Sequence, residues 1–544
     1  ATVGSLRGRR VPSKFEGIPA VVTYHPAYAL YDGASSQKGR GRGPDSSAVL
    51  AMITKDLELA RAPAKKEAGG EYEVVDTFSK FEELRPLLYD AGVLAWDIET
   101  SGLSPLDDDW VGISFSFGEG SGFYIPLKYW RGLDDYASRR HAHNFWKKRS
   151  QRVALRRAFR DVLGVPGPVR VGHGARFDRV WLLHRGIPAF VEADTLVMHH
   201  LLDENAMHGL SELAFSFTTM GGYDSPLDAW LEEHRPEMVR AQAARRKLFG
   251  PDSVKRGGNW KRKGVAPLEL LGPYAAGDAD CSLRLYYKFR PQLEKLGVWK
   301  LFFDLLMPVS DVLADSEYRG VTIDGERMRE LHSKYVAEMA QLRGEFIRLT
   351  GADDTLNLKS TKQVSALLFD KLKLKPAGRT KGGAPSLREG ALNVMMERRR
   401  HPALETLLHY RKLGKLVSTY LDQALDVNSR LHPQYNLAGT VTGRLSCRNP
   451  NAQNIPRESQ VRQLFVATAN HRLVDVDFAQ AEFRVWGALA KDKALLRDVQ
   501  KGLDIHTRVA AGVFDVDEAD VSKEQRTQAK MTVFGVMYGR GVES

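Results

Sequence analysis

The spacing of hydrophobic and polar positions changes along this chain, and the changes predict segments of different structure. From Tyr72 onward the pattern predicts a strand, a helix and then the apolar strand VLAWDIET (93–100), which is α/β patterning. After about residue 295 the apolar positions recur at helical spacing over long stretches. A mixed region begins near residue 430 and includes the strand-like segment HRLVDVDFA (471–479). The pattern predicts a multidomain protein of the α/β and α+β classes.

Length and composition agree with a soluble protein of several domains. At 544 residues the chain is too long for one hydrophobic core. No run of about 18 apolar residues predicts a transmembrane helix, so we expect no membrane partner. The N-terminal stretch lacks the apolar core of a signal peptide. The two cysteines, Cys281 and Cys447, cannot build a disulfide framework, which fits a reducing cytoplasm.

The charge balance favours a polyanionic partner. Lys and Arg outnumber Asp and Glu by 79 to 67, which gives a net charge of +12. Basic side chains release counterions when they neutralise phosphates, and a soluble basic surface is the alternative. The clusters RGRR (7–10), KKRSQR (147–152) and KRGGNWKRK (255–263) favour nucleic acid. Two of them contain or adjoin tryptophans, which we expect to stack on bases.

Carboxylates recur in three segments that suit metal chemistry. In WDIET, Asp97 and Glu99 stand two apart on a predicted strand, so both side chains leave the same face. Carboxylates so placed repel each other unless a cation lies between them, and oxygen ligands suit Mg²⁺ or Mn²⁺. Asp178 begins a predicted helix, and Tyr274 lies one helical turn before Asp278. Together they suit two metal ions and an attacking water in phosphodiester hydrolysis, although each motif alone is common on surfaces.

The segments WDIET, GHGARFDRVWLL and YAAGDADCSLRLYY, in this order, resemble the DEDDy class of 3′→5′ exonucleases, the proofreading type with an RNase H-like fold. The resemblance implies four metal ligands and one tyrosine that holds the nucleophilic water: Asp97, Glu99, Asp178, Asp278 and Tyr274.

This chain departs from the proofreading pattern at three places. Gly174 stands where these domains usually carry Asn, and Gly277 replaces a common acidic residue. Neither change removes a metal ligand, so we expect cleavage to survive. The stretch 223–266 is longer and more basic than the family pattern, and we expect an insertion that contacts DNA.

A stripe near the end of the sequence suits a nucleotide. Arg526, Lys530, Phe534 and Tyr538 recur every four residues, so on a helix they share one face. With three upstream segments they resemble family A DNA polymerases, of the DNA polymerase I type. These segments are GTVTGRLSCRNPNAQNIP (439–456), HRLVDVDFAQAEFRVWGALA (471–490) and GLDIH (502–506). The resemblance covers about residues 72–544 and implies an exonuclease domain followed by a partial right-hand polymerase.

The resemblance also implies roles for residues of the polymerase part. Asp477 would bind both catalytic metals, and Glu482 would disfavour a ribose 2′-hydroxyl. The incoming triphosphate would be held by three side chains: His506, Arg526 and Lys530.

Further polymerase roles concern the bases. Phe534 would pack on the incoming sugar and base, and Tyr538 would guard the template position. Contacts to primer–template would come from three side chains: Arg444, Gln453 and Asn454.

The polymerase site lacks one expected part. The family supplies a second palm carboxylate from a His-Asp-Glu turn, and no such tripeptide occurs in the sequence. We therefore expect a half-built site that belongs to a fragment or a split gene, completed in the second case by a separate C-terminal palm polypeptide. The segment FEGIPAVVTYHPAYAL (15–30) resembles the C-terminal part of iron–sulfur uracil-DNA glycosylases, but without their pocket or cluster cysteines we expect no glycosylase activity.

These resemblances predict five regions: a glycosylase-like remnant (1–64), the exonuclease domain (65–295), a thumb-like helical region (296–430), a partial palm (431–490) and partial fingers (491–544). We expect a family A DNA polymerase with a proofreading exonuclease, which acts in replication or repair in a bacterial or phage-infected cell. It would use primer–template DNA, dNTPs and two Mg²⁺ or Mn²⁺ per active site. The alternatives are a 3′→5′ exonuclease with a polymerase-like DNA-holding module, and a DNA-binding protein with idle metal sites.

Overall fold

The computed structural model divides the chain into two compact units, residues 1–466 and 467–544. It describes residues 10–11, 20–21, 70–249, 261–380, 382–456 and 459–539. The glycosylase-like segment 15–30 therefore lies almost wholly outside the described residues, apart from the short strand β2 (Ala20–Val21), which pairs antiparallel with β1 (Arg10–Val11). Within the described part, no helix has the length and apolarity needed to cross a membrane.

A mixed six-stranded sheet forms the centre of the first unit. Its strands are β3 (Glu71–Val74), β4 (Val93–Thr100), β5 (Trp110–Ser116), β6 (Ser121–Pro126), β9 (Val169–Gly172) and β10 (Ala193–Asp194). Their order is β10-β9-β4-β5-β6-β3. β4 runs parallel to β9 and antiparallel to β5, so the strand predicted at residues 93–100 is confirmed as a central strand.

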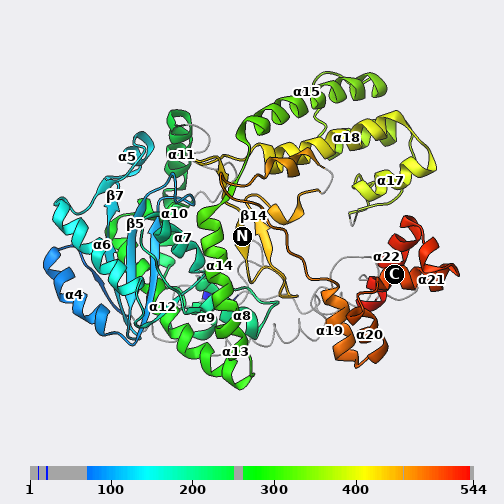
Figure 1. The fold of residues 1–544 in the computed structure, drawn as a ribbon. Helices are drawn as coiled ribbons and strands as arrows, with labels where there is room; N and C mark the ends of the chain where they lie inside the picture. The colour runs from blue at the N-terminus through cyan, green and yellow to red at the C-terminus, as the bar shows by residue number, and fades with distance from the viewer. Residues whose placement is uncertain are drawn as a thin grey trace. The chain divides into compact units, whose positions relative to one another are not determined.

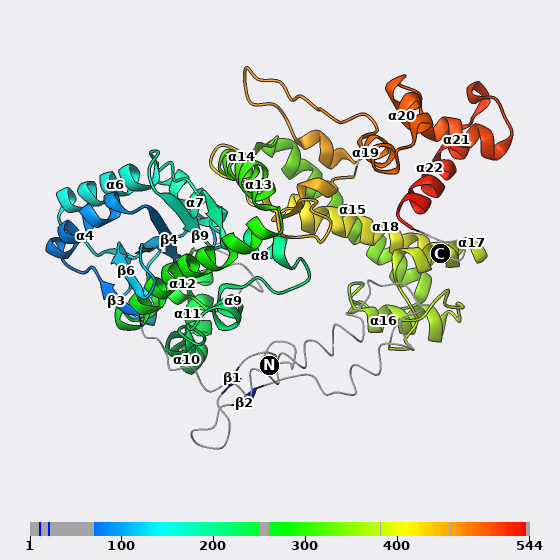
Figure 2. The same cartoon turned by 90° about the horizontal axis from the view of Figure 1, so that it is seen from below.

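Helices cover both faces of this sheet (Figure 2). They are α4 (Phe78–Asp90), α6 (Arg149–Leu163) and α7 (Arg176–His184) on one face, and α8 (Thr195–Leu202), α9 (Leu210–Phe217) and α12 (Leu268–Lys295) on the other. In β4, Trp96 and Ile98 pack into the core under the first three helices, whereas Ala95 packs under α12. Since side chains alternate along a strand, Asp97 and Glu99 share the α12 face.

An excursion leaves the sheet after β6. The strand β7 (Lys128–Tyr129) pairs antiparallel with β8 (His143–Asn144), and α5 (Leu133–Ser138) lies between them in sequence. Trp130 and Tyr136 pack there against Met238 and Ala241 of the next layer. That layer belongs to the predicted insertion 223–266, whose described part includes α10 (Ser225–Glu233), α11 (Arg235–Phe249) and the short 3₁₀ turn η2 (Lys263–Val265).

Long helices follow the sheet domain, as the helical spacing after residue 295 predicts. They include α14 (Met307–Arg319), α15 (Gly325–Thr350), α17 (Glu389–Arg398) and α18 (Pro402–Leu416). α15 and α18 pack side by side (Figure 1). The start of α15, with Met328 and Leu331, meets the end of α18 at Leu413, whereas Phe346 near the end of α15 packs with Leu404. The two helices are therefore antiparallel.

Capping residues define the ends of α15. The Asp324 carboxylate accepts a hydrogen bond from the backbone N–H of Arg327 at 3.0 Å, which satisfies an unpaired donor of the first turn. At the other end Gly351 adopts a left-handed conformation, with φ of 61°. Two short antiparallel strand pairs also belong to the unit: β11 (Val321–Thr322) with β12 (Arg430–Leu431), and β13 (Gln434–Asn436) with β14 (Ser446–Arg448).

The second unit consists of short helices around a small core. They are α19 (Ala481–Ala490), α20 (Lys493–Gln500), α21 (Ile505–Phe514) and α22 (Lys523–Met537). Phe483, Val499 and Ile505 are buried where these helices meet. The helix predicted from the four-residue stripe is confirmed as α22.

The strand predicted at residues 471–479 is wrong. These residues are irregular, and Val474, Val476 and Phe478 are 81%, 85% and 88% exposed. A strand forms only where neighbouring backbone and an apolar layer cover it, and no described strand pairs with this segment. The alternation of apolar and acidic residues would suit a strand with one buried face, but no described residues cover the apolar side chains of this segment.

Candidate functional site: a carboxylate cluster between sheet and helix

Three of the predicted carboxylates converge between β4 and α12. One carboxylate oxygen from each of Asp97, Glu99 and Asp278 lies within 4.8 Å of the others. Asp178, in the first turn of α7, is buried, and its charge acts on Asp97. In turn, Glu99 and Asp278 act on Asp178. The four predicted ligands are therefore neighbours, although they come from three separate segments.

Burial and mutual repulsion make it energetically unfavourable for all the carboxylates of this cluster to be ionised when no cation is bound. Burial, followed by the charge of Asp278, raises the pKa of Glu99 to about 8. Burial is also the first cause that raises the pKa values of Asp97 and Asp178 well above the usual range, and the neighbouring carboxylates add to it. A divalent cation would offset this repulsion, and an oxygen-only donor set fits Mg²⁺ or Mn²⁺. The residues present therefore fit the metal that the sequence predicts.

The turn before α7 explains why glycine stands at position 174. Gly174 adopts a left-handed conformation with φ of 64°, which glycine tolerates without strain. Its N–H donates to the Asp194 carboxylate at 2.8 Å, and the N–H of Ala175 donates to the same carboxylate at 3.0 Å. Asp194 thereby fixes the turn that presents Asp178, a role that the sequence analysis did not assign.

Tyr274 contacts a cation at the edge of the cluster. The Lys263 Nζ donates to its hydroxyl at 2.5 Å and lies 4.1 Å from its ring centroid. The charge of Lys263 also lowers the pKa values of Glu99 and Asp278, against the effect of burial. The sequence analysis placed Lys263 in a basic cluster that favours nucleic acid, whereas in the structure its ammonium group contacts Tyr274 at the edge of the carboxylate cluster.

Tyr223 is a further member of this site that the sequence analysis missed. Its hydroxyl donates a short hydrogen bond to the Asp278 carboxylate, and its ring lies parallel to that of Tyr274, with centroids 6.1 Å apart. A Cβ at position 277 would lie 2.7 Å from the Tyr223 ring. Gly277, where the family commonly has an acidic residue, therefore leaves room for Tyr223 beside Asp278. The paired departures at Gly277 and in the insertion are the signal that could have revealed this contact.

The predicted nucleotide-contacting residues of the second unit also converge. His506 is buried at the start of α21, and its ring centroid lies 5.4 Å from that of Phe534. Tyr538 donates to the Glu482 carboxylate at 2.9 Å. The Lys530 Nζ lies 5.9 Å from the Phe534 ring centroid. Five of the six predicted residues thus share the space between α19, α21 and α22.

Asp504 connects the sixth predicted residue, Arg526, to this group. Its carboxylate accepts from the backbone N–H of His506 at 3.0 Å, as the cap of α21, and from the Arg526 Nε at 2.7 Å. Burial, followed by the charges of Arg526 and Lys530, lowers the pKa of His506, and Asp504 opposes this effect. The sequence analysis did not assign Asp504, which orients both His506 and Arg526.

The remaining predicted site residues do not converge. Asp477 is exposed in the irregular segment before α19, and the described residues place no cluster of three metal-ligating side chains around it. Arg444 is exposed in the loop between β13 and β14. Gln453 and Asn454 are exposed in a short 3₁₀ turn, η6 (Ala452–Asn454). Their predicted roles stay predictions.

The comparisons with known proteins agree with this arrangement. The family model described as "3'-5' exonuclease" matches residues 72–294, and the model described as "DNA polymerase family A" matches residues 325–544. An exonuclease domain followed by a polymerase domain is the class that the fold and site define. Residues 325–544 therefore match DNA polymerase family A and residues 72–294 match the 3'-5' exonuclease family, so the predicted resemblance and fold class are confirmed.

Two relatives illustrate the extent of the similarity. DNA polymerase I of Pseudomonas aeruginosa is 32% identical over 499 residues, which cover 89% of this chain and 50% of that protein. The DNA polymerase of Escherichia phage T5 is 29% identical over 536 residues, which cover 92% of this chain and 58% of that protein. The chain thus spans about half the length of the curated relatives it matches. The comparisons do not support a separate palm polypeptide or the glycosylase-like remnant.

One solved structure shares the fold. The POL domain of Pol1 from M. smegmatis, solved in complex with DNA primer-template and dNTP, has a TM-score of 0.60 and 22% sequence identity. The similarity covers 86% of this chain and 71% of that one. At this level of identity the similarity supports the fold.

The raised pKa of Glu99 predicts a stability effect that depends on pH. Because its folded-state pKa is about 8 instead of 4.5, the stability from protonated Glu99 is present below pH 4.5 and lost as pH rises through 8. In EDTA at pH 8.5, Glu99→Gln is expected to melt about 5 °C or more above the wild type. The difference should shrink at pH 5 and also when Mg²⁺ stabilises the wild type, as thermal melts would measure. A lower melting temperature for the variant at pH 8.5 would contradict the electrostatic account.

Proposed function

We propose that this chain acts as a family A DNA polymerase of the DNA polymerase I type, with an exonuclease domain that removes nucleotides from a DNA 3′ end. The convergence of Asp97, Glu99 and Asp278, with Asp178 beside them, carries the exonuclease part of this proposal. These residues would hold two Mg²⁺ or Mn²⁺, and bound metals supply charge stabilisation and an activated water. We assign the exonuclease to residues 65–295, and the thumb, palm and fingers regions to 296–430, 431–490 and 491–544.

The residues around the cluster have distinct tasks in this proposal. Tyr274 orients the attacking water through its hydroxyl, which Lys263 contacts. Tyr223 and Asp194 hold Asp278 and the turn before α7 in place. The partly enclosed position between sheet and helix limits competing water and strengthens the interaction of the scissile phosphate with fixed charges.

Primer trimming tests the exonuclease. The full chain with Mg²⁺ and a 5′-labelled primer–template should shorten the primer from its 3′ end, and EDTA should stop the reaction. Intact primers after long incubation in Mg²⁺ and in Mn²⁺ would refute the activity.

The polymerase part rests on the second unit. We propose that Arg526, Lys530 and His506 hold the triphosphate of an incoming dNTP, with Phe534 against its sugar and base and Glu482 beside the sugar. Asp477 would bind the polymerase metals, and Tyr538 would guard the template position. Arg444, Gln453 and Asn454 would contact primer–template DNA. The bound primer-template and dNTP of the M. smegmatis protein support this assignment of partners.

Nucleotide binding provides a test on α22. Lys530→Ala should weaken dNTP binding about tenfold, because charge-assisted hydrogen bonds contribute roughly 1.5–3 kcal/mol. Lys523→Ala removes an exposed lysine from the first turn of the same helix and should have little effect. Fluorescence titration with a labelled dNTP and Mg²⁺ measures both. Equal affinities for the two variants would contradict the assignment.

A second candidate function is a 3′→5′ exonuclease whose polymerase-like part only holds DNA. The exposed position of Asp477, without a described carboxylate cluster around it, favours this alternative. Trimming without measurable dNTP binding would support it over the polymerase.

A further inference from the structure

The basic charge of this protein is concentrated in one short segment. Residues 128–160 contain eleven Lys and Arg and two Asp, whereas the whole chain has a net charge of +12. The segment comprises the β7–β8 hairpin, α5 and most of α6. Neither the carboxylate cluster nor the proposed nucleotide site uses these side chains.

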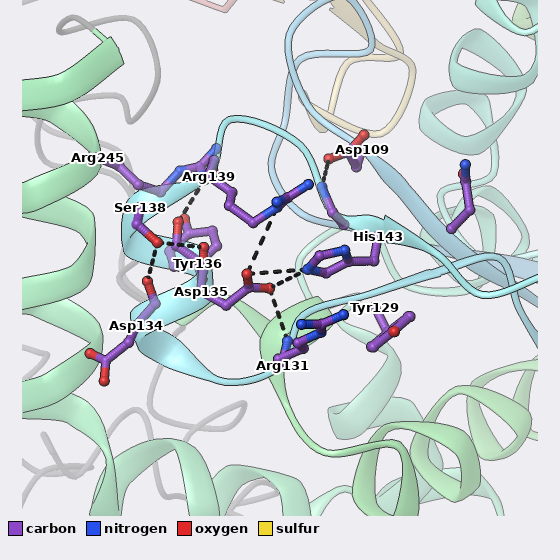
Figure 3. Close-up of polar contacts among 12 residues, drawn as sticks. Asp109, Tyr129, Arg131, Asp134, Asp135, Tyr136, Ser138, Arg139, His143 and Arg245 are labelled. Carbon is purple, nitrogen blue, oxygen red and sulfur yellow. Dashed lines mark hydrogen bonds and ion pairs between the residues drawn. The ribbon is translucent and has the colours of Figure 1, made fainter.

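Two carboxylates, buried Asp109 and half-buried Asp135, hold the hairpin in its conformation (Figure 3). The Asp109 carboxylate is buried, pairs with Lys128 and accepts from the Ala142 N–H at 2.7 Å. Asp135 accepts from the Arg131 N–H at 3.0 Å and lies 3.1 Å from the His143 Nε2. Asp109 and Asp135 are therefore both occupied by hydrogen bonds from the backbone and by ion pairs with residues of the hairpin.

Arg245 of α11 supports the same segment from below its surface. Its buried guanidinium donates to the carbonyls of Tyr136 at 2.7 Å and Arg140 at 2.9 Å, and also to the carbonyl of Arg139. It lies 4.5 Å from the Tyr136 ring centroid. A buried arginine thus fixes the backbone turn from which two other arginine side chains reach the exterior.

The framework leaves a set of cations exposed, which we call the hairpin surface: Arg131, Arg140, Lys147, Lys148 and Arg149. None of them has a carboxylate within ion-pair distance among the residues that the structure describes. Lys147 instead donates to the hydroxyl of Tyr129 at 3.3 Å. Hydrogen bonds from Lys147 and then Arg131 lower the pKa of Tyr129, as expected where positive charge is uncompensated.

The sheet register places the root of this surface near the carboxylate cluster. Glu99 of β4 is in register with Gly112 of β5, which is in register with Pro126 at the end of β6. Two strand spacings amount to about 10 Å. The excursion that carries the hairpin surface thus starts at the same end of the sheet as the metal-ligating end of β4.

The two tryptophans of the segment are too deeply buried to stack on bases. Trp146 and Trp130 are 4% and 8% exposed and pack in the cores beneath the hairpin. The expected stacking of the tryptophan beside KKRSQR on bases is therefore wrong, because burial of the indole ring prevails. With both tryptophans buried, the exposed cations suit phosphate contacts that are independent of base sequence.

We propose that the hairpin surface binds the phosphate backbone of the DNA strand whose 3′ end enters the carboxylate cluster. This inference rests on the proposed exonuclease function. The surface extends the site along the strand, so that a long substrate gains contacts that a trinucleotide does not reach.

The triple variant K147A/K148A/R149A tests this surface in the full chain. In EDTA its affinity for a fluorescent 20-nucleotide strand should fall about tenfold at moderate salt. The slope of log K against log salt should fall by about 2, since each lost contact on single strands contributes about 0.7. In Mg²⁺, kcat/KM should fall for the 20-mer and stay unchanged for a trinucleotide. The control K288A/K295A/K300A removes three exposed lysines from α12 and from the short helix α13 (Trp299–Leu301) that follows it, and should change none of these values.

The possible outcomes distinguish failure of the proposed DNA-binding surface from failure of the proposed exonuclease reaction. An unchanged salt slope, or an equal loss in the control, would overturn the proposal, as would a matching loss on the trinucleotide. If the wild type cleaves neither substrate, the proposed exonuclease function is refuted. The salt dependence of binding still shows whether the hairpin surface contacts DNA. A thermal melt equal to that of the wild type shows that the triple variant remains folded.

Discussion

Asp97→Ala is expected to abolish trimming of a primer 3′ end in Mg²⁺. Asp97 supplies a carboxylate oxygen to the cluster with Glu99 and Asp278. If Asp97 is a ligand as proposed, its loss weakens the metal site and forfeits several kcal/mol of charge stabilisation, which corresponds to a rate lower by about 1,000-fold or more. Initial rates on a 5′-labelled single strand under excess enzyme measure the effect on the chemical step.

Thermal melts distinguish a loss of activity in Asp97→Ala from a loss of folding. Because the pKa of Asp97 is raised well above its usual value by burial and by neighbouring carboxylates, the folded protein bears an electrostatic cost that the variant removes. Without metal at pH 8, Asp97→Ala should therefore melt no lower than the wild type. The control Asp107→Ala removes an exposed carboxylate from the loop before β5 and should trim normally. Unchanged trimming by Asp97→Ala would remove the basis of the exonuclease assignment.

Regular periodicity explains which parts of this site could be predicted. Alternation along β4 separates Trp96 and Ile98 from Asp97 and Glu99, so a spacing of two identifies a shared face. A spacing of four on α12 likewise places Tyr274 and Asp278 on one face. These local rules predict the two pairs, and the resemblance carried by the order of the motifs predicts that the carboxylates of the separate segments converge.

Contacts between distant segments explain what could not be predicted. Tyr223 reaches Asp278 across 55 positions, and only the missing Cβ of Gly277 admits its ring. Asp194 fixes the turn before α7 through two backbone N–H groups, which no side-chain motif records. In the segment 471–479 the local pattern predicted too much. Its alternation suits a strand, but among the described residues no strand pairs with it and its apolar side chains stay exposed.

Tyr223→Phe is expected to raise the Mg²⁺ concentration needed for half-maximal trimming by about tenfold, because outer hydrogen-bond partners of metal ligands typically contribute 10–100-fold. The change keeps the ring that lies parallel to Tyr274 and removes only the hydroxyl that donates to Asp278. Excess metal should restore most of the rate, which identifies Tyr223 as a positioning residue. Tyr287→Phe, an exposed tyrosine on α12, is the matched control and should leave the Mg²⁺ titration unchanged.

Gly277→Ala tests the same contact from the opposite side. Its Cβ would lie 2.7 Å from the Tyr223 ring, too close for the ring to stay, so the hydroxyl should move away from Asp278. This variant should therefore require more Mg²⁺, as Tyr223→Phe does. Because both changes remove one interaction, the double variant should need no more Mg²⁺ than the more impaired single variant. Additive increases, or a wild-type titration for Tyr223→Phe, would show that Asp278 is held without Tyr223.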